Sequence, residues 1–190
     1  HIVINHDDGL VPNGSLSIEA TIKATNLDDI HFITMKGDYG WGMYLSEGYI
    51  GYASDYSLSK HPKSDISIET DVWYTIGVNL IEGVGGEFTI NGTKVGNISA
   101  ENAKIPAGDF GSNDCYTSGD SCDELYIARM GAGCDCYYFE GIIDDVTIAF
   151  EENGTWTPAS HWTFWEGEGG DTGDALNDGT LQRVGYIEGA

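Results

Sequence analysis

Apolar and polar residues alternate strictly along Leu16-Ser17-Ile18-Glu19-Ala20-Thr21-Ile22-Lys23. This period of two places the apolar side chains on one face of a strand and the polar side chains on the other, as in a sheet with one buried face. The same pattern recurs at Val72, Tyr74, Ile76, Val78 and Leu80, and again at Ile142, Val146 and Ile148. No stretch shows a convincing apolar stripe with the 3.6-residue period of a helix. The alternation therefore predicts an all-β protein.

Shorter strands are predicted at residues 2–4, 31–35, 43–46, 49–53, 86–90 and 125–129. Turn-forming sequences separate them, among them Asp7-Asp8-Gly9, Pro12-Asn13-Gly14 and Asn91-Gly92. Many short strands joined by such turns are typical of a two-sheet antiparallel β-sandwich or jelly roll. No linker and no internal repeat interrupts the pattern, so residues 1–190 are predicted to form a single domain.

The charge balance excludes several kinds of partner. The 190 residues hold 8 Lys+Arg against 31 Asp+Glu, which gives a net charge of −23. Binding to nucleic acid is not expected, because phosphates require clustered basic residues. No apolar run is long enough for a membrane-spanning helix. The hydrophobic share of 41% is sufficient for a buried core.

Four cysteines and four glycosylation sequons favour an extracellular or cell-surface location. Cys115, Cys122, Cys134 and Cys136 are predicted to form two disulfides, as in secreted domains. A bridge between Cys134 and Cys136 would be strained, so we favour pairing each of them with Cys115 or Cys122, while a Cys115–Cys122 loop remains open. Their spacing does not resemble a zinc site. The sequons begin at Asn13, Asn91, Asn97 and Asn153, although Asn-Gly is also common in turns.

Five segments, taken in order, resemble LamG-like jelly rolls of the concanavalin A-like superfamily. They cover residues 15–23, 33–45, 73–78, 88–93 and 139–148, and they include Trp73-Tyr-Thr-Ile-Gly-Val78 and Phe139-Glu-Gly-Ile-Ile-Asp-Asp-Val146. The resemblance implies a concanavalin A-like sandwich. It says little about function, because the fold hosts lectins, binding modules, adhesins and some glucanases.

The order of the segments is permuted relative to that family. The sequence His161-Trp-Thr-Phe-Trp165, continued to Asp174 and Leu181, resembles the strand with which the family usually opens, yet it stands near the end of this chain. Residues 159–187 are therefore predicted to supply permuted strands that complete either the same sandwich or that of a neighbouring subunit. In the second case Trp162, Phe164 and Trp165 would fill the neighbour's groove, and copies would add head to tail into a filament.

The resemblance also implies a structural calcium ion. In LamG-like folds an Asp of the opening strand lies near an acidic segment of the last strand, and the two together bind the ion. The resemblance implies that these ligands correspond here to Asp174 and to Asp144 or Asp145, with Asn177 close by. Calcium prefers six to eight oxygen ligands from such residues. The alternative is that these carboxylates belong to a plain acidic surface.

Catalysis is not expected, because no segment carries the E-x-D-x-(x)-E arrangement of concanavalin A-like glucanases. Glycan binding would need exposed aromatic rings. Tyr56 and Tyr116 are the strongest candidates, because both lie in predicted loops. The other candidates are Tyr39, Trp41, Tyr44, Tyr52, Tyr137 and Tyr138, which could equally face the core.

Two hypotheses for the function follow. The favoured one is a non-catalytic, secreted structural or adhesive subunit that assembles with copies of itself into an extracellular filament by β-strand exchange. The alternative is a monomeric, calcium-stabilised, lectin-like module that binds carbohydrate as part of a larger secreted protein. The expected partners are accordingly copies of the chain, glycans, or both.

Overall fold

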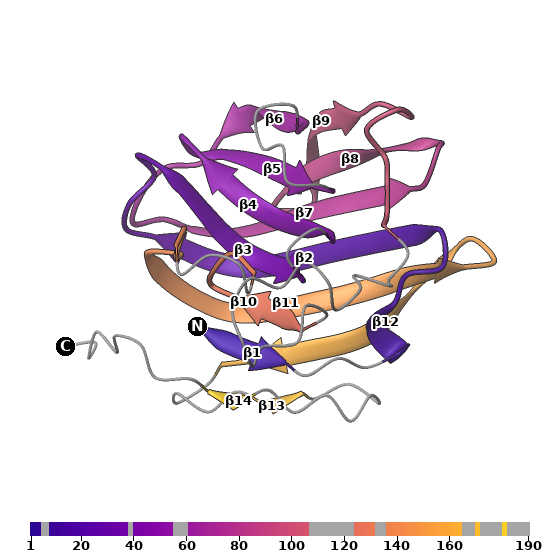
Figure 1. The fold of residues 1–190 in the computed structure, drawn as a ribbon. Coiled ribbons are helices and arrows are strands. Elements are labelled where there is room, and N and C mark those ends of the chain that lie inside the picture. Colours follow the sequence, from indigo (N-terminus) through magenta and orange to yellow (C-terminus); the bar gives the residue numbers. More distant parts are fainter. Residues whose placement is uncertain are drawn as a thin grey trace.

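Two antiparallel sheets lie face to face in a computed structural model of the chain (Figure 1). The structure describes residues 1–4, 8–37, 40–54, 61–106, 124–131 and 136–164, together with the backbone of residues 170–171 and 180–181. A 3-10 turn, η1 (Asp8–Leu10), precedes the first long strand. Within this described part, no helix has the length and apolar character needed to cross a bilayer.

We call the two seven-stranded sheets sheet A and sheet B. Sheet A has the order β14 (Thr180–Leu181), β1 (Ile2–Ile4), β10 (Leu125–Ile127), β3 (Ile30–Lys36), β4 (Gly42–Ser46), β5 (Tyr49–Ala53) and β6 (Lys63–Ser67). Sheet B has the order β13 (Gly170–Asp171), β12 (Thr155–Thr163), β11 (Gly141–Glu152), β2 (Ser15–Ala24), β7 (Trp73–Ile81), β8 (Gly85–Ile90) and β9 (Thr93–Ile98). This architecture confirms the predicted all-β sandwich.

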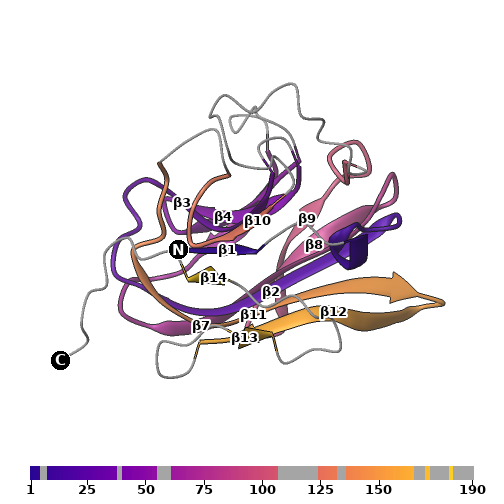
Figure 2. The same cartoon turned by 60° about the horizontal axis from the view of Figure 1, so that its bottom comes forward.

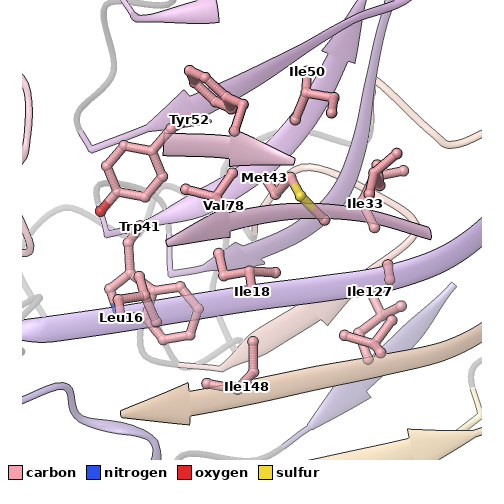
Figure 3. Close-up of a cluster of buried hydrophobic side chains, with 14 of the residues drawn as sticks. Leu16, Ile18, Ile33, Trp41, Met43, Ile50, Tyr52, Val78, Ile127 and Ile148 are labelled. Atoms are coloured by element: carbon pink, nitrogen blue, oxygen red, sulfur yellow. The ribbon is translucent and has the colours of Figure 1, made fainter. Parts of the chain in front are cut away.

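The main hydrophobic core lies between the sheets. Ile18 and Val78 of sheet B face Met43 of sheet A across the core, as Figure 3 shows. The alternation in β2 has the predicted effect, because its apolar residues point inward and are fully buried, while Ser17, Glu19 and Thr21 point outward. Complete burial of one such aliphatic side chain stabilises the fold by about 1.5–3 kcal/mol.

The alternation in β11 is interrupted. Ile142 was expected to share the buried face of Val146 and Ile148, but its side chain is 49% exposed. A register shift between Ile143 and Asp145 explains the difference, since one extra residue in the strand reverses the direction of the side chains beyond it. Ile142 therefore lies on the outer face, opposite Lys23 of β2.

The C-terminal strands pair within the same chain. β11 and β12 form a hairpin through Asn153 and Gly154, whose φ angles of 54° and 82° suit a tight two-residue turn. Trp162 lies opposite Val146 and is fully buried in the main core. The Phe164 N–H donates to the Asp144 carbonyl at 2.9 Å, whereas Trp165 lies outside the described residues. Two further pairs, β13 with β12 and β14 with β1, are also formed in cis.

The edge strands β6 and β9 close one side of the sandwich. A Cβ atom added at Gly96 of β9 would lie 3.0 Å from the Ser64 Cα atom of β6. The two strands therefore approach each other through a position that has no side chain, and the free edge of each sheet lies beside the other.

The two kinds of isoleucine position give a direct test of this core. We expect Ile18→Ala to lower the free energy of unfolding by about 2–5 kcal/mol, because it leaves a cavity among fully buried side chains. Ile142→Ala, the matched change at an exposed position, should cost less than about 1 kcal/mol. Urea denaturation followed by circular dichroism measures both values. Similar losses from the two variants would contradict this description of β11.

Candidate functional site

The outer face of sheet A carries a second apolar layer. Outer faces of a sandwich are usually polar, because they meet solvent. Here Phe32, Met35, Tyr44 and Tyr126 are all at most 2% exposed and form clusters separate from the main core. We call these four residues and the neighbouring Tyr137 the aromatic layer. Figure 2 shows the central strands of sheet A above those of sheet B. The layer lies on the face of sheet A that is turned away from sheet B, because its residues form clusters separate from the core between the sheets.

The strand register builds the layer in rows. Phe32 of β3 lies opposite Tyr44 of β4, and Tyr44 lies opposite Gly51 of β5. Gly51 in turn pairs with Lys63 of β6. Paired residues on neighbouring strands project from the same face of a sheet, so the four positions form one continuous row. A second row runs through Val3, Tyr126, Met35, Gly42 and Ala53.

Glycine makes room for the central tyrosine. A Cβ atom at Gly51 would lie only 2.2 Å from the Tyr44 Cζ atom, so the phenol ring lies directly over the backbone of β5. The ring starts on β4 and therefore extends across β5 toward β6. Gly42 has a similar role in the second row, where a Cβ atom would lie 2.9 Å from the Met35 sulfur.

Tyr137 extends the first row to the solvent. Its carbonyl accepts a hydrogen bond from the Phe32 N–H at 3.0 Å, and its φ of 53° lies in the left-handed region. The Tyr137 ring centroid lies 6.4 Å from that of Phe32, which lies 5.4 Å from that of Tyr44. These separations are typical of interacting aromatic rings. At 37% exposure, Tyr137 is an accessible end of the row.

Basic side chains border the layer. The Arg129 guanidinium lies 4.9 Å from the centroid of the Tyr126 ring, a cation–π distance, and Tyr126 donates its hydroxyl proton to Glu124 at 2.6 Å. At the opposite end of the sheet, Lys63 donates from Nζ to the Ser46 Oγ atom at 2.8 Å. Two of the 8 Lys+Arg residues of this acidic chain therefore belong to the same face.

Two buried tyrosine hydroxyls differ in their partners. Tyr52, in the main core, donates to the Lys104 carbonyl at 2.8 Å. The Tyr44 hydroxyl is buried and has no hydrogen-bond partner in the described structure. Burial raises the pKa of Tyr44 to about 12, and burial together with the charge of Glu82 raises the pKa of Tyr52 as well. Both groups are therefore protonated at neutral pH.

This difference predicts opposite effects of one substitution. Tyr52→Phe should lower the free energy of unfolding by about 1–3 kcal/mol, because the Lys104 carbonyl loses its buried donor. Tyr44→Phe should leave stability unchanged or raise it, because it removes a buried hydroxyl that has no partner. Thermal unfolding of the two variants provides the measurement. A large loss of stability in Tyr44→Phe would show that the hydroxyl is bonded in the folded protein.

The outer face of sheet B is largely polar, apart from exposed apolar side chains such as Ile142 and Trp73. Ser17 donates to the Asn79 side chain at 2.6 Å, and the hydroxyls of Thr21 and Thr75 lie 3.2 Å apart. Asp145 lies 3.7 Å from the His161 Nε2 atom. Burial and the charge of Asp145 raise the pKa of Glu19, and His161 partly opposes them. The polar residues of this face thus form short hydrogen bonds and ion pairs with one another.

The raised pKa of Glu19 predicts how its removal depends on pH. A carboxyl whose pKa is raised on folding stabilises the protein most when protonated, and this contribution is lost as the pH rises above the usual value of 4.5. Glu19→Gln should therefore raise the free energy of unfolding at pH 7, by less than about 1 kcal/mol because the site faces solvent. Below pH 4 the effect should vanish, as urea denaturation at the two pH values would measure.

A matched control is Glu87→Gln. Glu87 lies 3.3 Å from the Lys94 ammonium, so its substitution should lower stability at pH 7 by up to about 1 kcal/mol. A loss of stability in Glu19→Gln at pH 7 would contradict the assigned direction of the pKa shift.

The predicted calcium site is described only in part. Asp144 and Asp145 lie at the bulge in β11, with Asp145 next to His161, and Asp174 and Asn177 lie outside the described residues. Within the described ranges, no group of three or more His, Cys, Asp or Glu side chains could hold a metal ion. The described carboxylates do not fit calcium by themselves, so the four-residue site stays a prediction.

The other predicted sites have mixed outcomes. The sequon residues Asn13, Asn91, Asn97 and Asn153 are all exposed, as glycosylation requires, while the modification itself stays a prediction. Cys136 takes part in a disulfide bond; Cys115, Cys122 and Cys134 lie outside the described residues, so the pairing stays a prediction.

The predicted glycan-binding residues Tyr56 and Tyr116 also lie outside the described residues. Of the remaining aromatic candidates, Trp41 and Tyr52 belong to the main core.

The predicted site residues did not include Phe32, Gly51, Lys63 or Arg129. One signal was present, because the strands of sheet A contain consecutive apolar residues, such as Phe32-Ile33 and Met43-Tyr44-Leu45, where β2 alternates. Such runs indicate a strand with both faces buried. The register that joins Gly51 to Lys63 leaves no comparable mark in the sequence.

The fold is similar to several solved structures of low sequence identity. A Bacteroides ovatus protein assigned as carbohydrate-binding matches 94% of this chain with a TM-score of 0.65 and 14% identity, and 54% of its own length is covered. The CBM40 domain of the Ruminococcus gnavus IT-sialidase, solved with α2,3-sialyllactose, matches 72% of this chain and 76% of its own (TM-score 0.54, 14% identity). Mouse laminin α1 domains LG4-5 match 83% of this chain and 41% of their own (TM-score 0.53, 10% identity).

These likenesses define the class of fold. The chain adopts the concanavalin A-like, LamG-like jelly roll that the sequence segments predicted. It spans about half the length of the Bacteroides ovatus protein, at 54%. No protein-family model matches the sequence, and no curated protein matches it either. Circular permutation of the strands stays a prediction.

Proposed function

We propose that this chain is a non-catalytic, glycan-binding module of a secreted protein, and that it binds glycans at the Tyr137 end of the outer face of sheet A, where the aromatic layer is exposed. The observation that carries the proposal is the aromatic layer on a face that a sandwich normally gives to polar residues. Ligand sites in proteins combine an apolar, aromatic lining with a few polar groups that orient the ligand. Sugars suit such a lining, because the C–H face of a pyranose ring packs against an aromatic ring.

The accessible parts of the layer fit this use. Tyr137 is the exposed aromatic ring, and Phe32 and Tyr44 continue the same row behind it. Lys63, at the other end of the row, is exposed and supplies donors for sugar oxygen atoms. The Bacteroides ovatus and Ruminococcus gnavus proteins, whose names state carbohydrate binding or a bound sugar, support the same class of ligand. The exposed sequons and the disulfide at Cys136 support secretion.

The filament hypothesis has less support than glycan binding. Strand exchange requires a segment that can leave its own sheet, yet β12 is joined to β11 by the two-residue Asn153-Gly154 turn. Trp162, which was predicted to fill a neighbour's groove, is buried in the core of its own chain. Opening this hairpin would expose both strands. Glycan binding at sheet A requires neither strand exchange nor a calcium ion.

Two exposed aromatic residues on opposite faces provide the test. On a glycan array, we expect the wild-type protein to retain a defined set of glycans. Tyr137→Ala should weaken their binding about 3- to 10-fold, as expected from the loss of about 0.5–1.5 kcal/mol of aromatic contact. Trp73→Ala is the matched control, because Trp73 is 46% exposed at the outer face of sheet B beside Lys23.

Equal losses from the two variants would place the ligand elsewhere, and a wild-type protein that retains no glycan would overturn the proposal. Thermal unfolding of each variant would show that a change in binding does not reflect unfolding.

A further inference from the structure

One end of the outer face of sheet B is apolar. Ile142 of β11 lies opposite Lys23 of β2, and Lys23 lies opposite Trp73 of β7, so the three side chains form one row on this face. Ile142 is 49% exposed and Trp73 is 46% exposed. Large apolar side chains that are exposed together often mark a contact with another group.

The Trp73 ring is covered on one side only. β7 lies between β2 and β8 in sheet B (Figure 1). The Lys23 ammonium lies 5.6 Å from the centroid of the Trp73 ring, on the side of β2. On the side of β8 the pairing ends at Ile76 and Ile90, so no β8 residue lies opposite Trp73. The half-exposed ring is therefore open toward the turn that joins β8 to β9.

That turn holds the sequon Asn91-Gly92-Thr93. The φ angles of Asn91 and Gly92, 50° and 72°, are those of a tight two-residue hairpin turn. The Asn91 N–H donates to the Thr75 carbonyl at 2.7 Å, which fixes the turn beside β7. Thr75 and Trp73 lie two positions apart on the same face of β7, a separation of about 7 Å.

A second hydrogen bond fixes the Asn91 side chain. The Thr75 N–H donates to the Asn91 Oδ1 atom at 2.9 Å. The Asn91 Nδ2 atom takes no part in this bond, and it is the atom to which an N-linked sugar is attached. Attachment therefore leaves the bond to Thr75 in place. A sugar on Asn91, which is exposed, would start from a side chain already held close to the open side of Trp73.

We infer that Asn91 carries an N-linked glycan, and that the first sugar of this glycan, an N-acetylhexosamine, packs against the Trp73 ring. The inference uses only the secretion of the chain from the proposed function. During transfer the Nδ2 atom attacks the anomeric carbon of a lipid-linked sugar diphosphate. A C–N bond forms, the bond from that carbon to the diphosphate oxygen breaks, the diphosphate leaves with the electron pair, and the amide loses one proton.

The attached sugar shields the apolar row from water, because the C–H face of its pyranose ring covers the open side of the indole. Attachment also holds the sugar at a high effective concentration, so a single ring contact is sufficient. A glycan in solution lacks this advantage, so Trp73 remains a valid control for glycan binding at sheet A.

The test uses the chain secreted from a eukaryotic cell line. Mass spectrometry of its peptides should find a glycan on Asn91. Thr93→Ala removes the sequon and leaves Asn91 itself unchanged. We expect it to lower the unfolding temperature of the glycosylated protein by about 2–4 °C, because the contact with Trp73 is lost. In a Trp73→Ala background the same substitution should have almost no effect, since the two changes remove one interaction.

A spectroscopic signature supports the same contact. The acetyl methyl protons of the first sugar should shift upfield in the NMR spectrum, because they lie near the indole ring, and should return to their usual position in Trp73→Ala. Protein made without glycans shows what Thr93→Ala does by itself.

Ser99→Ala is the matched control, because it removes the neighbouring sequon at Asn97. Asn97 lies opposite Glu87, beside a charged side chain instead of an aromatic ring. Any effect of Ser99→Ala should therefore be the same with and without Trp73.

The outcomes separate the inference from the proposed function. An unmodified Asn91 in the secreted protein would overturn the inference, as would a Thr93→Ala effect that is equally large in the Trp73→Ala background. Neither result bears on glycan binding at Tyr137, which the array measures. Conversely, a protein that retains no glycan on the array would overturn the proposed binding and leave this inference intact.

Discussion

Sheet A buries side chains on both of its faces, and this constraint shapes the rest of the molecule. Its inner face packs against sheet B through residues such as Met43 and Ile127, while its outer face holds Phe32, Tyr44 and Tyr126. A sheet apolar on both faces needs space for large rings over its strands. Gly51 provides that space for Tyr44, since any side chain there would meet the ring. The second layer thus depends on small residues in the strands beneath it.

Sheet B has one buried face and one solvated face. The outer faces of sheet A and sheet B therefore differ in chemistry. Its exterior is held by short polar contacts, such as Ser17 to Asn79, and carries carboxylates. The exterior of sheet A is aromatic, with lysine and arginine at its borders. The proposed carbohydrate recognition at the exposed end of sheet A uses this difference, because a sugar presents both C–H surfaces and hydroxyl groups to its binding site.

The sequence predicted the fold correctly where the alternation of apolar and polar residues matches the buried and exposed faces of a strand. In β2 the alternation alone gives the strand and its buried face, and β5 (Tyr49–Ala53) was predicted with its observed bounds. The edge strand β6 was not predicted, because its residues are mostly exposed and show little apolar period. Ile142 was assigned to the wrong face because a bulge is not visible in the alternation. Tyr44 and Tyr137 were among the aromatic candidates, but only strand register shows that Tyr44 shares a row with Lys63.

The close approach of β9 to β6 at Gly96 also bears on colloidal behaviour. Sheet edges carry unpaired amide and carbonyl groups that can recruit strands from other molecules. On this side of the sandwich the two edges lie beside one another, and the absence of a side chain at Gly96 allows this close approach. A single glycine, which also lies against the core residue Phe88, therefore allows each of these two edges to shield the other from strands of other molecules.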